Sequence, residues 1–169
     1  MIIEIVLVTI LIISLYTDIR DRKILNIVTL PTILFAFIFH IGTQGMEGFL
    51  FSGKGFLTGL GLLIIPYLLG GMGAGDVKLM AAIGALMGTN FVFYSFIYTA
   101  LIGGVIALVL IIKQKGLVNS MKSFFYTIVF FRSNLGSMLL GKDKHSSISF
   151  PYGIAIVLGT LCSLIWGGF

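Results

Sequence analysis

Long apolar runs separated by short polar segments dominate the chain and predict an all-α, polytopic membrane protein. Runs of about 16–23 apolar residues match the length of a helix that crosses a bilayer. The predicted spans cover residues 2–17, 25–41, 53–69, 77–87, 91–112 and 150–166. We therefore expect one transmembrane domain over residues 1–169, with six transmembrane helices.

Glycine-rich and polar segments mark the expected interruptions. Residues 77–112 are too long for one crossing, and Gly88-Thr89-Asn90 is the natural break. Residues 70–75 hold four glycines, which disfavour an ordinary helix there. The polar residues 42–48 predict a short turn between the second and third spans.

Residues 113–149 are expected to form a cytoplasmic loop. Within it, apolar residues recur every three or four positions over 117–139, and polar residues occupy the other side. This period is typical of a helix that lies in the membrane interface. A polar stretch over 141–149 then leads to the last span.

Composition agrees with a membrane protein, and charge gives its orientation. Only 10% of the residues are charged, against about 25% in soluble domains. Six crossings place every Lys and Arg except Lys54 on the cytoplasmic side, as the positive-inside rule requires, with both termini outside. The net charge of +5 thus reports orientation and does not indicate nucleic-acid binding. Basic residues follow the first run, so we expect a retained helix and not a cleaved signal peptide.

The residue types limit the chemistry. Cys162 is the only cysteine, which excludes a disulfide scaffold and a cysteine-ligated metal site, and we expect it to pack as an apolar residue. His40 and His145 fall on opposite sides of the membrane in this topology, so no Ser-His-Asp set forms. We expect no metal and no cofactor.

Asp18 and Asp76 are the candidate catalytic residues. The topology brings both to the cytoplasmic face at similar depth, and an ionisable group in a membrane is a functional candidate. Two carboxylates that share a proton can activate water and polarise a carbonyl without a metal. Taken singly, Asp18 also fits an interfacial charge beside Arg20 and Arg22, and Asp76 also fits an N-cap for residues 77–87.

Three segments resemble one family. Gly73-Ala74-Gly75-Asp76 is a GxGD motif, Thr17 to Asn26 resembles an Asp, basic stretch, Ile-Pro-Asn pattern, and Phe150 to Ala155 resembles the opening of a last helix. Together they resemble the type IV prepilin peptidases, which are GxGD membrane aspartic proteases. The resemblance assigns Asp18 and Asp76 as the catalytic pair.

Each residue in or beside the GxGD motif has two possible roles. Beside the catalytic pair, Gly73 and Gly75 would let a substrate strand approach the backbone, although glycine in membrane helices most often serves helix packing. Lys78 would contact the substrate or a carboxylate, although it also fits a simple positive-inside anchor.

The chain departs from the family pattern in two ways. Leu25 stands where relatives commonly have proline, which bears on local backbone geometry. The chain also begins at the first catalytic helix, without the N-terminal extension and cysteine-rich loop of larger members. The resemblance therefore implies a compact enzyme with peptidase activity and without methyltransferase activity.

The implied activity is removal of the leader from pilin-, archaellin- or tight-adherence-type precursors, after a glycine, at the cytoplasmic membrane face. The expected partners are a substrate with a basic leader and an apolar helix, and the lipid bilayer; no nucleic acid is expected, and homo-oligomer formation stays open. Presenilin-like proteases share GxGD but pair it with Tyr-Asp and Pro-Ala-Leu motifs, whereas Thr17 precedes Asp18 here. A transporter or scaffold with a proton relay is the alternative from another class.

Overall fold

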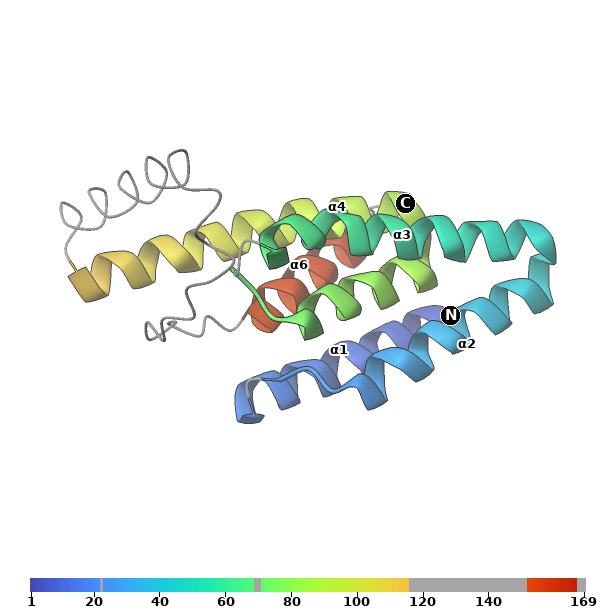
Figure 1. Cartoon of the computed structure of the whole chain (residues 1–169), viewed down its shortest axis with the longest axis horizontal. Coiled ribbons are helices and arrows are strands. Elements are labelled where there is room, and N and C mark those ends of the chain that lie inside the picture. The colour runs from blue at the N-terminus through green and yellow to red at the C-terminus, as the bar shows by residue number, and fades with distance from the viewer. Residues whose placement is uncertain (22, 69–70, 116–151, 167–169) are drawn as a thin grey trace, which may run out of the picture. The chain divides into compact units, whose positions relative to one another are not determined.

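Helices make up the computed structural model, which describes residues 1–21, 23–68, 71–115 and 152–166 (Figure 1). No strand occurs within these ranges, so the expected all-α class is confirmed for them. The helices are α1 (Ile2–Asp21), α2 (Asn26–Gln44), α3 (Met46–Leu68), α4 (Ala74–Lys115) and α6 (Tyr152–Trp166).

Helices α1 to α4 are each long and apolar enough to cross a membrane, and α6 is a shorter apolar helix. Between 17% and 33% of the most apolar window of each long helix is buried, so most of these side chains face outward. Large apolar side chains such as Ile5, Ile12 and Leu34 are exposed, which suits lipid and not water. The chain is therefore a multi-pass membrane protein.

Helices α1 and α3 extend furthest beyond the apolar runs that predict them. Helix α1 ends at Asp21, four residues after the predicted end at residue 17, so Asp18 lies in its last turn. Helix α3 begins at Met46 and not at residue 53, so the turn expected over 42–48 is reduced to Gly45. Gly45 adopts a positive φ of 61°, which glycine tolerates, and its N–H donates to the Ile41 carbonyl at 2.8 Å. One residue is thus enough to reverse the chain.

Helix α4 contains the break expected at residues 88–90. Gly88 has non-helical backbone angles (φ 85°, ψ 179°), and Figure 1 shows the ribbon doubling back there. Residues 74–87, called the first arm below, therefore run opposite to residues 89–103. The first arm begins three residues before the predicted position 77.

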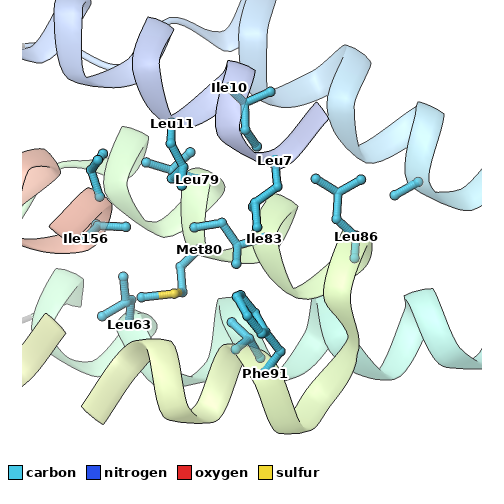
Figure 2. Close-up of a cluster of buried hydrophobic side chains, with 14 of the residues drawn as sticks. Leu7, Ile10, Leu11, Leu63, Leu79, Met80, Ile83, Leu86, Phe91 and Ile156 are labelled. Carbon is cyan, nitrogen blue, oxygen red and sulfur yellow. The ribbon is translucent and has the colours of Figure 1, made fainter. Parts of the chain in front are cut away.

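The first arm of α4 is the centre of the hydrophobic core. Its apolar side chains over residues 77–86 are buried among residues of α1, α3 and α6 (Figure 2). The largest contributors are Leu7, Ile10, Leu11, Leu63, Leu79, Met80, Ile83, Leu86, Phe91 and Ile156. Protein therefore surrounds this helix, which carries Asp76 in its first turn.

Glycines bring the backbones of α3 and the first arm together. A side chain at Gly55 would overlap the Gly84 carbonyl, and one at Gly84 would overlap the Gly55 carbonyl. One turn along α3, Gly59 lies against the Met80 carbonyl. Gly55 and Gly59 thus form a GxxxG interface, in which small residues permit close helix packing.

The chain divides into two compact units: residues 1–103 with 150–169, and residues 104–149. The first unit contains both aspartates and the helices around them. Of the second unit, the structure describes the end of α4, residues 104–115. The interfacial helix expected over 117–139, the polar stretch over 141–149 and His145 lie outside the described residues.

Candidate active site

Asp18 points into the helix bundle. Its side chain is 7% exposed and shares a face of α1 with the buried Ser14 and Thr17. Arg20 is exposed instead and donates to the Tyr16 hydroxyl at 3.1 Å. Among the described residues, no cation forms a salt bridge with Asp18. Asp18 is therefore not an exposed interfacial charge paired with Arg20.

Asp76 lies in the first turn of α4 and is 8% exposed. Its Oδ2 atom accepts a hydrogen bond from the Gly73 N–H at 3.1 Å, and its own N–H donates to the Gly73 carbonyl at 3.2 Å. An acidic side chain at the third helical position commonly reaches back in this way. Asp76 therefore caps the N-terminus of α4, but it does so as a residue of the first turn and not from the N-cap position.

The two aspartates lie near each other. They come from different helices, both are buried, and they are close enough to interact electrostatically. The described residues contain no group of three side chains able to hold a metal ion. Two carboxylates shielded from water favour a shared proton, an arrangement suited to acid–base chemistry on a carbonyl.

Residues 24–26, which lead from α1 into the first residue of α2, lie against the start of α4. Ile24 packs on Gly75, and the Lys78 ammonium donates to Asn26 Oδ1 at 2.9 Å. Lys78 thus contacts an amide and not a carboxylate in this structure. Leu25 has φ −77° and ψ 132°, values that proline also adopts. The leucine therefore leaves the backbone in the geometry that a proline would give.

The two glycines of the GxGD motif differ in their surroundings. A Cβ at Gly75 would lie 2.9 Å from the Ile24 Cβ and 3.2 Å from its carbonyl oxygen. A Cβ at Gly73 would lie 3.5 Å from Asp76 Oδ2, which is an ordinary contact distance. Gly75 is therefore required for the packing of residues 24–26 on α4, whereas the space at Gly73 is open.

Alanine substitutions should separate these two roles. Gly75→Ala should lower the free energy of unfolding by about 1–3 kcal/mol, because the new methyl group pushes against the backbone of Ile24. Gly73→Ala should change it by less than about 0.5 kcal/mol. Thermal unfolding of the detergent-solubilised variants measures both values. Equal destabilisation of the two variants would contradict this account.

Two further residues contribute to the site without having been singled out by sequence. Gly153, in the first turn of α6, lies against the Asp18 carboxyl group. Asn26 accepts the hydrogen bond from Lys78. The resemblance of Phe150 to Ala155 and of Thr17 to Asn26 marks both segments, but it gives neither residue a role. Tyr152, beside Gly153, also interacts electrostatically with Asp76.

Comparison with known proteins adds one match. The sequence profile of the type IV leader peptidase family matches residues 5–108. That range covers more than half of the chain and includes both aspartates, residues 24–26 and the GxGD motif. No curated protein and no solved structure matches the chain.

Proposed function

Since the chain belongs to the type IV leader peptidase family and is therefore a peptidase, we propose that it is an aspartic endopeptidase that removes the leader of prepilin-like membrane proteins. The observation that carries this proposal is the proximity of Asp18 and Asp76. Both are buried, both lie at a helix end, and they interact electrostatically within one site.

In the proposed mechanism, one aspartate is ionised and takes a proton from water as the water attacks the scissile carbonyl. The other is protonated and donates a hydrogen bond to the carbonyl oxygen, which stabilises the negative charge that develops there. The nitrogen of the broken peptide bond then takes up a proton and leaves. The pair supplies every proton transfer, so the reaction requires no cofactor.

The substrate must reach this pair as an extended strand, because the carbonyl groups of a helix are hydrogen-bonded and shielded. Residues 71–73, just before α4, are not helical, and Gly71 and Gly73 are exposed. We infer that the strand to be cut lies beside these glycines, where a missing side chain leaves room for its backbone. The expected cleavage follows a glycine at the junction of a basic leader and an apolar helix.

The proposed topology has six crossings. They comprise α1, α2, α3, the parts of α4 on either side of Gly88, and α6. Exposed Arg20 and Lys23 follow Asp18 in the chain, and positive residues favour the cytoplasmic side. We therefore propose that the aspartates lie at the cytoplasmic face of the cell membrane.

The positions of the aspartates favour a peptidase over a transporter with a proton relay. A relay requires ionisable groups along a path near the middle of the membrane. Asp18 lies in the last turn of α1 and Asp76 in the first turn of α4. Both are therefore at helix ends and not along a path through the middle of the membrane.

The proposal is tested by a cleavage assay. The purified chain is incubated with a membrane protein that carries a basic leader, a glycine and an apolar helix, and the product masses are measured. We expect one cut after the glycine. A matched substrate with leucine in place of that glycine should remain intact. An uncut glycine substrate, or equal cutting of both substrates, would contradict the proposal.

A further inference from the structure

Gly153 leaves the space that the Asp18 carboxyl group occupies. It is buried in the first turn of α6. A Cβ at this position would overlap Asp18 Oδ2 and would lie 2.7 Å from its Cγ and 3.0 Å from its Cβ. Real Cβ atoms do not come so close to other heavy atoms, so any larger residue here displaces the carboxyl group or the start of α6.

The start of α6 also presents backbone N–H groups to Asp18. The backbone N–H groups of Ile154 and Gly153 interact with the Asp18 carboxyl group, while Oδ2 has no hydrogen-bond partner among the described residues. The first N–H groups of a helix lack intrahelical acceptors, and that end favours negative charge. Asp18 lies at the opposite end of its own helix, which disfavours negative charge. The N–H groups at the start of α6 therefore favour negative charge on Asp18, whereas the end of α1 disfavours it.

We propose that Gly153 is a positioning residue, which seats the Asp18 carboxyl group against the N-terminus of α6 so that it faces Asp76. The inference rests on the proposed function only in that Asp18 is one of the catalytic pair. Its structural part, the contact between Gly153 and Asp18, holds independently of any activity.

Gly159, two turns along α6, provides a matched comparison. A Cβ at Gly159 would overlap the Thr99 side-chain oxygen and would lie 2.7 Å from the Thr99 Cα. Its role is close packing of α6, with no contact to either aspartate. Gly153 differs because its close neighbour is the carboxyl group itself.

The kinetic test compares Gly153→Ala with Gly159→Ala. Displacement of a reacting group by about 1 Å costs on the order of 10²-fold in rate. We expect Gly153→Ala to lower kcat by about that factor with KM changed less than about twofold, because the substrate still binds. Gly159→Ala should lower Tm but keep kcat per folded molecule. Equal losses of kcat in the two variants would overturn the proposal.

A double-mutant cycle tests the contact without an activity assay. Gly153→Ala should lower Tm strongly in the wild-type background and much less in Asp18→Ala, since this variant lacks the oxygen and Cγ atoms that the methyl group meets. If Gly153→Ala alone does not fold, recovery of a folded double variant supports the contact. Equal Tm losses in both backgrounds, or a double variant that also fails to fold, would overturn it.

The two proposals fail in different ways. If Asp18→Asn retains cleavage, the proposed aspartic mechanism is wrong, whatever the cycle shows. If Asp18→Asn is inactive but the two Tm effects add, the mechanism stands and Gly153 has no positioning role.

Discussion

Asp76→Asn and Asp18→Asn are each expected to reduce leader cleavage by about 10²–10⁴-fold, the usual contribution of a positioned acid or base. Asparagine has nearly the size of aspartate, and its carbonyl oxygen can still accept the hydrogen bond that Gly73 donates to Asp76. It cannot exchange a proton with water or substrate. The variants should therefore fold and insert normally but fail to turn over, as single-turnover assays with purified protein will show.

Asp21→Asn is the matched control for this experiment. Asp21 lies one turn beyond Asp18 on the same helix, but its side chain is exposed. Its substitution should leave cleavage within about twofold of the wild type, as expected for a surface residue. Retained cleavage in the Asp18 or Asp76 variant, with Asp21→Asn equally active, would exclude the aspartate pair as the catalytic group.

Gly55→Val is expected to have the largest effect on folding. The Cβ alone would overlap the Gly84 carbonyl, so α3 and the first arm of α4 have to separate. Gly55→Ala should cost about 1–3 kcal/mol, as for overpacked cores. The larger valine should prevent a stable fold. Thermal unfolding and size-exclusion profiles in detergent measure the effect.

Gly61→Ala is the control on the same helix. Gly61 is exposed, and nothing lies within 4 Å of the position that its Cβ would take. Alanine there should leave Tm unchanged or raise it, because alanine favours helix over glycine by about 1 kcal/mol. A Gly55→Val variant as stable as Gly61→Ala would show that the two helices are not in close contact.

The sequence predicts the helices of this fold better than their ends. Apolar runs locate the membrane-crossing segments, and the break at Gly88 follows from a local glycine signal. Helices α1 and α3 extend beyond the apolar runs, because a hydrogen-bonded backbone continues through polar residues until something stops it. Between α2 and α3, Gly45 alone interrupts the helix. Composition does not distinguish a one-residue interruption from a longer turn.

The aspartate pair could be predicted from motif and topology, whereas the residues that hold it could not. Gly153 contacts Asp18, and Asn26 bonds to Lys78, across long stretches of sequence. No periodicity links such positions, because contacts of this kind depend on how helices pack. For the same reason, the motif does not predict that Gly75 is tightly packed and Gly73 is not, because the difference lies in their neighbours from other segments.

The contact between Asp18 and α6 also has a consequence for when the site can form during synthesis. Both aspartates are made within the first 76 residues, and the helix that seats Asp18 begins at Tyr152, after the last described residue of α4. A ribosome therefore delivers the acidic pair to the membrane well before it makes the amide groups of Gly153 and Ile154. Helix α6 thus completes the proposed centre, and we expect a nascent chain to lack peptidase activity until α6 has been made.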